Sequence, residues 1–454
     1  MTDVELPPQK ATAPRPLAEL LHLAIPTVTQ MASYTTMQFI DTWILSRLGE
    51  TAATAASNSG MLAFAFISVG MGTLVLVNTL VSQSFGRGEL DKCGQFLWQG
   101  IWLALAYGIA LLPLRMAAGS IFGVFHHPPI QHAMEAEYFR ISLLSAGVKL
   151  VSASIGQFFL GINRPNAVLA GAVFGVSVNA IAAWCIVLGH LGFASHGVAG
   201  AAWAQNIGVT CELLLLIALL TRRSVDSAYG ASDMRIRPRL MSMLLRIGLP
   251  SGGQWFSDVL AWSLFCNGVM GLIGPAAMAA NTFMLRYMVV SFLPVYGLSV
   301  AVTALVGRYI GRGEPAVARR RAHLGLAVAM TYVVLCGLAF VLARRPLIEV
   351  FSIDPQVDRI GRMLLILAAI YELSDALYIM YSGALRGAGD TLVPTLATAG
   401  MCWSLMLGGG FYVACRWPGW VTGPWTIACV YGWILGAWMT GRFVRGKWER
   451  IKLR

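Results

Sequence analysis

Seven ionisable residues lie inside long apolar stretches of the sequence, where a charge is costly. They are Asp41, Lys149, Glu212, Asp258, Arg286, Glu372 and Asp375. Ionisable groups in apolar runs of membrane length are rare, usually face a cavity, and bind ions or substrates or relay protons. The residue types therefore predict cation or proton chemistry inside a membrane.

Three of the acids have a spacing that favours a shared site. Tyr371 and Asp375 are four residues apart, which puts them on one face of a helix, with Glu372 at its edge. If Asp258 faces them, two or three carboxylates share a medium of low dielectric. One of them then takes up a proton, or a bound cation holds them together. A hard ion such as Na⁺ prefers oxygen ligands of this kind.

A static network of ion pairs is the alternative reading of the same charges. Arg286 could pair permanently with Asp258 or Asp375, as Lys149 could with Asp41. In that case the charges would hold the helices together and carry no ion.

Membrane helices must position these groups. The mean hydropathy of the 454 residues is +0.67 and only 12% of them are charged, which excludes a soluble protein of this size. Runs of roughly 20 apolar residues cross about 30 Å of hydrocarbon. Twelve such runs predict an all-α integral membrane protein, at residues 20–45, 56–82, 95–118, 137–160, 167–190, 197–221, 243–273, 278–306, 322–343, 361–384, 393–415 and 422–443.

The Lys and Arg residues of the chain are distributed unevenly between the two sides of this predicted membrane protein. With twelve spans both termini share a side, and that side collects 23 of the 33 Lys and Arg residues. The positive-inside rule then predicts a multi-pass protein of the cell inner membrane with both termini in the cytoplasm. The net charge of +12 needs no nucleic-acid partner. Trp417, Trp420 and Trp425 predict an aromatic belt at the membrane interface.

Three pairs of matching segments indicate an internal repeat. Pro26 and Gln30 align with Pro250 and Gln254 at an offset of 224 residues. Residues 86–89 and 311–314 both read GRGE, and their glycines predict tight turns with positive φ. Gly161 aligns with Gly387. The repeat predicts two pseudo-symmetric six-helix bundles around a central cleft.

The repeat and the spans together divide the chain into five parts. Residues 1–19 form an expected cytoplasmic tail, 20–221 the N-lobe and 222–242 a cytoplasmic linker. Residues 243–443 form the C-lobe and 444–454 a basic cytoplasmic tail.

The order of four motifs resembles that of the multidrug and toxic compound extrusion (MATE) family, within the multidrug, oligosaccharidyl-lipid and polysaccharide exporter superfamily. The motifs are P-x3-Q followed by FIDT from Pro26, SQSFGRGE from Ser82, ALRGAGDT from Ala384 and RFVRGKW from Arg442. The resemblance covers about residues 18 to 450. It implies an antiporter that exports amphipathic organic cations in exchange for Na⁺ or H⁺ by alternating access, without another cofactor.

The resemblance also assigns coupling residues. It implies that Asp41, Asp258, Tyr371 and Asp375 bind the coupling cation or proton, with Na⁺ at Asp258, Tyr371 and Asp375 if Na⁺ is the ion; the charge pattern adds Glu372. Asn179 matches the asparagine of the fifth helix. Two positions depart from the family pattern: Ala183 replaces a second polar group, and Gln205 stands where relatives often have threonine.

A substrate cleft would need acids, amides and flat aromatic surfaces for cationic organic molecules. The candidates are Asp41, Tyr34, Gln30, Gln254, Trp255, Trp262, Asn281, Lys149 and Arg286. We expect a small-molecule substrate and the lipid bilayer as partners, and a monomer suffices because both lobes belong to one chain.

Two other functions compete with this reading. A flippase or exporter of lipid-linked or anionic metabolites would use Lys149 and Arg286 to bind anions. A membrane enzyme would need catalytic groups in a long loop outside the membrane. The sequence has no such loop, no ATP-binding GxxxxGK[ST] motif and no hydrolase or metal signature, so we expect a transporter and not an enzyme.

Overall fold

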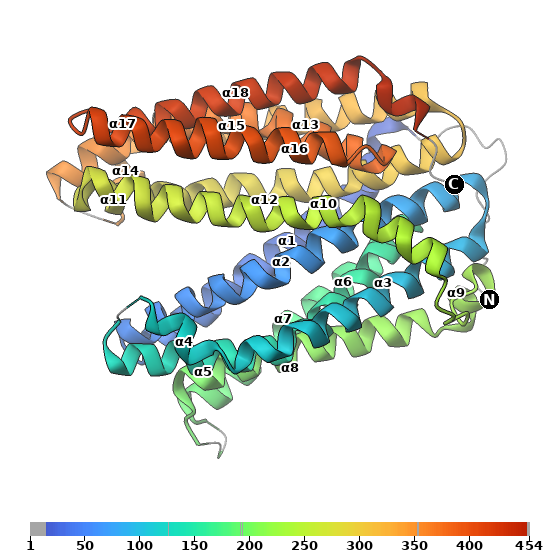
Figure 1. The fold of residues 1–454 in the computed structure, drawn as a ribbon, viewed down its shortest axis with the longest axis horizontal. Coiled ribbons are helices and arrows are strands. Elements are labelled where there is room, and N and C mark those ends of the chain that lie inside the picture. Colours follow the sequence, from blue (N-terminus) through green and yellow to red (C-terminus); the bar gives the residue numbers. More distant parts are fainter. Residues whose placement is uncertain (1–14, 126, 191, 193, 352–353, 452–454) are drawn as a thin grey trace. The chain divides into compact units, whose positions relative to one another are not determined.

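The computed structural model describes residues 15–125, 127–190, 192, 194–351 and 354–451, and these are almost entirely helical (Figure 1). Two of the elements, η2 and η3, are π-helical segments, and η1 and η4 are 3₁₀ turns. In chain order the elements are α1 (Pro16–Ser46), α2 (Glu50–Arg87), α3 (Leu90–Leu111), η1 (Leu112–Arg115), α4 (Ala118–Gly123), α5 (Pro129–Leu144), α6 (Ala146–Gly161), α7 (Pro165–Leu188), α8 (Gly197–Leu220), α9 (Arg223–Tyr229), α10 (Pro238–Ser263), η2 (Leu264–Val269), α11 (Met270–Ile273), α12 (Pro275–Gly311), α13 (Pro315–Leu342), α14 (Arg344–Glu349), α15 (Pro355–Ala388), α16 (Leu392–Met401), η3 (Cys402–Gly409), α17 (Gly410–Arg416), α18 (Gly423–Val444) and η4 (Lys447–Arg450).

The helices have membrane length. Among the described residues, 10 helical runs are long and apolar enough to cross a membrane, and α5 with α6, bent by 45°, makes an eleventh. The 31 residues of α1 span about 46 Å at 1.5 Å per residue. Eleven of the twelve predicted runs overlap these candidates, and the run at 20–45 overlaps α1, so the prediction of an all-α membrane protein is confirmed. The run at 137–160 is divided at Ser145, where α5 ends and α6 begins.

The described chain forms two compact units. Unit 1 comprises Thr29–Gly252, and unit 2 comprises residues 15–28 together with 253–451. Two helices are therefore shared: α1 passes from unit 2 to unit 1 shortly after Pro26, and α10 passes from unit 1 to unit 2 shortly after Pro250. A proline inside a helix removes a backbone donor and permits a bend.

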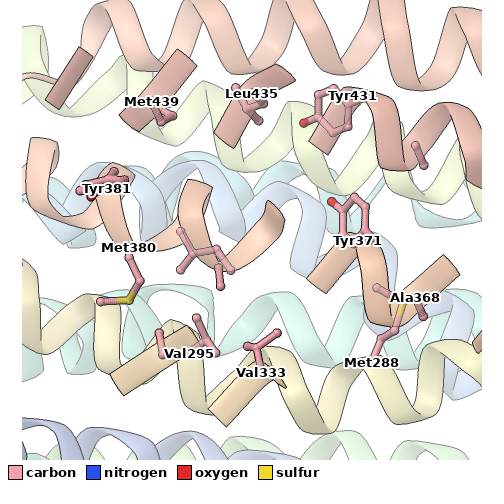
Figure 2. Packing of buried hydrophobic residues seen from close by; sticks show 14 of the residues in the cluster. Met288, Val295, Val333, Ala368, Tyr371, Met380, Tyr381, Tyr431, Leu435 and Met439 are labelled. Carbon is pink, nitrogen blue, oxygen red and sulfur yellow. The ribbon is translucent and has the colours of Figure 1, made fainter. Parts of the chain in front are cut away.

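Unit 2 is organised around α15, which packs against α12, α13 and α18. Small residues bring α15 close to α12. The hydroxyls of Ser299 and Thr303 donate to the carbonyls of Ile379 and Gly383 at 2.9 Å each, and hydrogen bonds of this kind hold membrane helices together. Figure 2 shows apolar side chains from the four helices meeting in this core, among them Met288, Val295, Val333, Ala368, Tyr371, Met380, Tyr381, Tyr431, Leu435 and Met439.

Close helix contacts also build unit 1. α6 packs against α2 and α3, and α7 packs against α8. A Cβ atom on Gly175 of α7 would lie 2.9 Å from the carbonyl oxygen of Gly208 on α8, so only glycine permits this approach. Across α2 and α6, the amide of Asn78 donates to the Gln157 Oε1 atom at 3.1 Å.

A buried ion cluster anchors the first part of α1 in unit 2. The Glu19 carboxylate accepts a hydrogen bond from the Tyr309 hydroxyl at 2.8 Å and one from Arg321 Nε at 2.8 Å. Leu20 and Leu23 of the same segment are fully buried in the core of unit 2. Since an isolated charge there would be costly, this cluster fixes the position of the helix.

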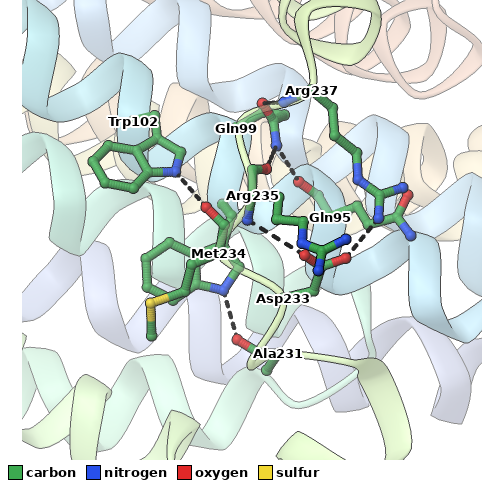
Figure 3. Close-up of polar contacts among 9 residues, drawn as sticks. Gln95, Gln99, Trp102, Ala231, Asp233, Met234, Arg235 and Arg237 are labelled. Carbon is green, nitrogen blue, oxygen red and sulfur yellow. Dashed lines mark hydrogen bonds and ion pairs between the residues drawn. The ribbon is translucent and has the colours of Figure 1, made fainter.

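The segment between α9 and α10 runs along α3 (Figure 3). The Gln99 side chain binds it twice, donating to the Arg235 carbonyl at 3.0 Å and accepting from the Arg237 N–H at 2.9 Å. Trp102, one turn further along α3, donates to the Met234 carbonyl at 2.9 Å. The N–H of Arg235 and then the Arg237 guanidinium lower the pKa of Asp233. This segment is therefore held on unit 1.

The two GRGE turns have the predicted backbone. Gly88 has a φ of 78° and Gly313 a φ of 77°, so the second glycine of each motif is left-handed, as expected. Hydrogen bonds from Lys92 and then Arg87 lower the pKa of Glu89 in the first turn.

A substitution at Gly387, a residue of the internal repeat on α15, can test how closely α15 packs against α12. A Cβ atom there would clash with the Thr303 carbonyl oxygen, whereas a Cβ on Gly400 of α16 would meet nothing within 4 Å. We expect Gly387→Ala to lower the free energy of unfolding by about 1–3 kcal/mol through overpacking. Gly400→Ala should have no effect or add up to about 1 kcal/mol of helix propensity. Thermal unfolding in detergent measures both, and equal stabilities would contradict this account.

Candidate functional site

One face of α15 carries the central groups of unit 2. Tyr371, Asp375 and Tyr378 follow one another at spacings of four and three residues. The Tyr371 side chain, which is buried, lies close to the Asp375 carboxylate. Asp258 on α10 lies within electrostatic range of Asp375. The structure therefore brings together the two carboxylates and the tyrosine that the sequence singled out.

Gln254 ties this face of α15 to its neighbours. It lies one turn before Asp258 on α10, and its side chain is close to that carboxylate. Its Nε2 atom donates to the Tyr378 hydroxyl oxygen at 2.8 Å, and its Oε1 atom accepts from the Thr395 hydroxyl at 3.0 Å. Gln254 thus lies beside Asp258 and connects α10, α15 and α16.

Arg386, not Arg286, is the basic group beside these acids. Arg386 lies within electrostatic range of Asp258 and Tyr378. Arg286 is exposed on α12 and takes part in none of the ion pairs between described residues. The static pairing of Arg286 with Asp258 or Asp375 is therefore wrong. Met284 and Met288 take the buried face of α12, which turns position 286 away from the core.

Aromatic rings surround Tyr371. The ring of Trp262 lies 5.7 Å from that of Tyr371 and 6.0 Å from that of Trp425, centroid to centroid. Trp425 donates to the Asn281 Oδ1 atom at 2.8 Å and is fully buried. Its prediction as a residue of the interfacial belt is wrong, because the indole N–H finds its partner inside the unit. Trp255 lies apart from this cluster, edge-on to Tyr296 at 5.8 Å.

Two π-helical segments adjoin the acids. η2 begins six residues after Asp258, and η3 begins at Cys402, which lies within electrostatic range of Asp258. A π-helical turn shifts the register of the side chains that follow and is frequent at functional sites. Neither segment was predicted from the sequence.

Glu372 points to another side of α15. Its carboxylate lies beside the Ser291 hydroxyl of α12, and within electrostatic range of Tyr332 and Cys336 of α13. The side chain is only 2% exposed, and within the described part of the chain its Oε1 atom has no hydrogen-bond partner. It lies within electrostatic range of both Asp375 and Tyr371, and the structure shows no hydrogen bond from it to either of them.

In unit 1 the predicted groups separate into two clusters. Asp41 lies beside Asn179 and within electrostatic range of Lys149 and Tyr138. The Lys149 ammonium donates to the Gln205 Oε1 atom at 2.8 Å. Gln205, one of the two departures from the family pattern, therefore holds the lysine that faces Asp41.

The second cluster contains Tyr34 and Gln30 of α1. The Tyr34 hydroxyl donates to the Glu212 Oε1 atom of α8 at 2.8 Å, and Gln30 approaches that hydroxyl at 3.5 Å. Tyr34 thus contacts the buried carboxylate of Glu212, and Gln30 contacts Tyr34. The sequence predicted Glu212 as an ionisable membrane residue but assigned it to no site.

The clusters differ in the chemistry that they support. The cluster of unit 2 offers two carboxylates and a phenol beside aromatic faces, which suits a small cation or the charged end of an aromatic substrate. The cluster at Asp41 already contains a cation in Lys149.

A family model described as MatE matches residues 26–185 and 259–407, more than half of the chain. The chain belongs to the MatE family. The match covers both halves of the chain, and both Asp41 and Asp375 fall within it.

Curated relatives of this MatE chain match it over most of its length. The probable multidrug resistance protein NorM of Bradyrhizobium diazoefficiens is 27% identical over 438 residues, which are 95% of this chain and 88% of the relative. The multidrug resistance protein PmpM of Pseudomonas aeruginosa is 27% identical over 403 residues, 87% of this chain and 83% of the relative.

Solved structures share the fold. An outward-facing multidrug resistance MATE family transporter of the MOP superfamily has a TM-score of 0.87 at 17% identity, covering 98% of this chain and 100% of its own. The eukaryotic MATE transporter AtDTX14 has a TM-score of 0.84 at 19% identity, covering 96% of this chain and 97% of its own. This MatE chain therefore has the two-lobe fold of MATE membrane transporters.

Four residues of the clusters were not predicted as site residues. Arg386 belongs to the ALRGAGDT motif and Tyr378 lies three residues after Asp375, so position alone could have indicated both. Glu212 stood out as ionisable, but its partner on α1 could not be read from the sequence. Trp425 gave no signal beyond its residue type.

The Gln254 network yields a stability prediction. Gln254→Leu leaves the Tyr378 and Thr395 hydroxyls without their amide partner, and we expect a loss of about 1–3 kcal/mol in the free energy of unfolding. Gln38→Leu, on an exposed part of α1, is the control and should change stability little. Thermal unfolding of the purified variants compares them, and an unchanged Gln254→Leu protein would contradict the bridging role.

Proposed function

We propose that this MatE chain is a secondary active antiporter that exports organic, cationic and amphipathic compounds in exchange for Na⁺ or H⁺. The observation that carries the proposal is the cluster of unit 2, in which Asp258 and Asp375 lie with Tyr371 next to the rings of Trp262 and Trp425. The names of the relatives NorM and PmpM as multidrug resistance proteins support drug export.

Competition for the carboxylates would couple the two fluxes. Two acids in a medium of low dielectric repel each other, so they bind a cation or proton strongly when substrate is absent. An organic cation that stacks on Trp262, which is only partly buried, neutralises the same charge and makes the small ion dispensable. Each ligand then favours the state in which the other leaves, and this difference in binding drives the exchange.

The charges of the described loops support an orientation. Arg87 and Arg312 lie at the two GRGE turns, and Arg235 and Arg237 lie in the segment along α3. By the positive-inside rule this side faces the cytoplasm of a cell whose inner membrane contains the protein. Two units in one chain make a monomer sufficient for transport.

Removing either carboxyl charge should stop export. We expect Asp258→Asn and Asp375→Asn each to lower gradient-driven efflux of a fluorescent organic cation by on the order of tenfold or more, since about 1.4 kcal/mol of lost binding corresponds to tenfold. The assay uses purified protein in proteoliposomes under a separately imposed Na⁺ or pH gradient. The gradient that drives efflux identifies the ion.

Glu89→Gln, at an exposed turn, serves as the control and should transport normally. Normal efflux by both aspartate variants would overturn the proposal, provided that each variant is inserted in the liposomes at the level of the unmodified protein.

A flippase or exporter of anionic or lipid-linked compounds is the second candidate. Lys149 and Arg386 favour it, because both place a positive charge within membrane-length helices. A solved MOP superfamily transporter from Pyrococcus furiosus, with a TM-score of 0.85 at 19% identity, is described as having a binding pocket of reverse polarity. If neither gradient moves any organic cation but labelled anionic lipid is flipped, and Lys149→Met abolishes flipping, this function replaces the first.

A further inference from the structure

Unit 1 contains two carboxylates within its membrane helices, and their surroundings differ. Asp41 on α1 has a basic neighbour, Lys149, within electrostatic range. Glu212 on α8 is only 6% exposed. The negative charges of the two acids must therefore be offset by different groups.

Asp41 is balanced by a group that belongs to the protein. Lys149 is held in place by its hydrogen bond to Gln205 Oε1 at 2.8 Å. An ammonium held within electrostatic range of a carboxylate offsets its charge. An external cation would have to displace or overcome Lys149 before it could bind Asp41, so this pair is poorly suited to carry an exchanged ion.

Glu212 has only neutral partners among the described residues. The Tyr34 hydroxyl of α1 donates to its Oε1 atom at 2.8 Å, and the Ser152 hydroxyl of α6 lies beside it. The facing part of α7 contributes Gly171 and Gly175, which have no side chain to titrate. Tyr34 is therefore the single titratable group that faces Glu212 from the elements packed against it, within the described chain.

The position of Glu212 is built by close helix packing. A Cβ atom on Gly175 would lie 2.9 Å from the Glu212 Cβ atom, and one on Gly171 would lie 3.6 Å from its Cγ atom. The two glycines thus form a slot on α7 that receives the side chain. α7 closes one side of the carboxylate, and Tyr34 approaches it from α1.

A membrane carboxylate without a basic partner must be neutralised by a proton or a bound cation. Hard metal ions take about six or more oxygen ligands, and this cluster offers a carboxylate and two hydroxyls. The Tyr34 hydroxyl also directs its hydrogen at the carboxylate, where it would repel a metal ion. A proton needs only one oxygen, so the chemistry of the cluster favours a proton.

We propose that Glu212, capped by Tyr34, takes up and releases one proton in each transport cycle of unit 1, while Lys149, within electrostatic range of Asp41, offsets the charge of that acid. This inference rests on the proposed function as an ion-coupled exporter. Uptake forms one O–H bond on the Glu212 carboxyl group and removes its negative charge. Release returns that proton to water and restores the carboxylate.

The path of α1 connects this site to the rest of the protein. Residues 15–28 of α1 belong to unit 2, where Glu19 binds Arg321, and the helix enters unit 1 five residues before Tyr34. A movement of α1 therefore changes the distance from the Tyr34 hydroxyl to Glu212. Loss of that hydrogen bond destabilises the carboxylate and favours the protonated form.

The first test is infrared difference spectroscopy of the full chain in lipid, titrated with pH in the absence of substrate. The unmodified protein should show a titrating C=O band of a protonated carboxyl group that is missing from Glu212→Gln, whatever further bands Asp258 and Asp375 contribute to both proteins. Tyr34→Phe should keep the band and shift its midpoint pH upward, because the carboxylate loses a donor. Lys149→Met should add one further titrating band, because Asp41 loses its internal cation.

Transport supplies the second readout. Glu212→Gln should lower efflux driven by a pH gradient by on the order of tenfold or more, and Glu89→Gln is the control. If Glu212→Gln does not fold, Tyr34→Phe still tests the site through its midpoint shift. Identical titrating bands in Glu212→Gln and the unmodified protein, or the absence of any titrating band in the unmodified protein, would overturn the proposal. Failure of all organic cations to move, with the Glu212 band present, would instead overturn the proposed function alone.

Discussion

The cost of a charge inside a membrane governs this structure. Where a carboxylate only fastens helices, it has a basic partner in direct contact: Glu19 binds Arg321 at 2.8 Å, and Asp390 binds Arg442 at 2.8 Å. Where the acids could carry an ion, their close partners are hydroxyls, as for Asp375 with Tyr371 and Glu212 with Tyr34. A hydroxyl stabilises a carboxylate without cancelling its charge. A mobile ion can therefore still bind the carboxylate and neutralise it.

Small residues make these arrangements possible. Lipid tails provide no hydrophobic drive between helices, so association depends on close packing and hydrogen bonds. In unit 2, a Cβ on Gly432 of α18 would lie 3.2 Å from the Tyr371 ring, which shows how closely α18 holds that ring. In unit 1, Gly175 brings α7 against α8 and so encloses Glu212. The same packing that stabilises each unit thus positions its acids.

Two helices, α1 and α10, each belong to both units, and each carries a polar group shortly after it enters the second of them. Asp258 lies on α10 five residues after that helix enters unit 2 at Gly253, and Tyr34 lies on α1 five residues after it enters unit 1 at Thr29. Both helices contain a proline a few residues before the transition, at Pro26 and Pro250. The repeat in the sequence therefore appears in the structure as two equivalent helices, each carrying a polar group for the unit that it enters.

Much of the fold could be predicted from the sequence. The helices, the repeat and the left-handed glycines at positions 88 and 313 depend on hydropathy and on local backbone preference, and both are properties of short stretches of sequence. The identities of the ionisable residues, and the helix face that Tyr371 and Asp375 share, could also be predicted from the sequence. The family resemblance added the pairing of Asp258 with Asp375, which no local pattern contains.

Only the tertiary structure decided which groups meet. Arg286 and Arg386 are both arginines on apolar helices, but the packing of α12 turns the first outward, while the second lies within electrostatic range of Asp258. Trp425 is buried because Asn281 receives its N–H, and Glu212 gains Tyr34 because α1 passes beside α8. A sequence fixes the faces of a helix only relative to each other. Which face meets which neighbour depends on contacts between distant segments, and π-helical turns such as η2 and η3 change the register further.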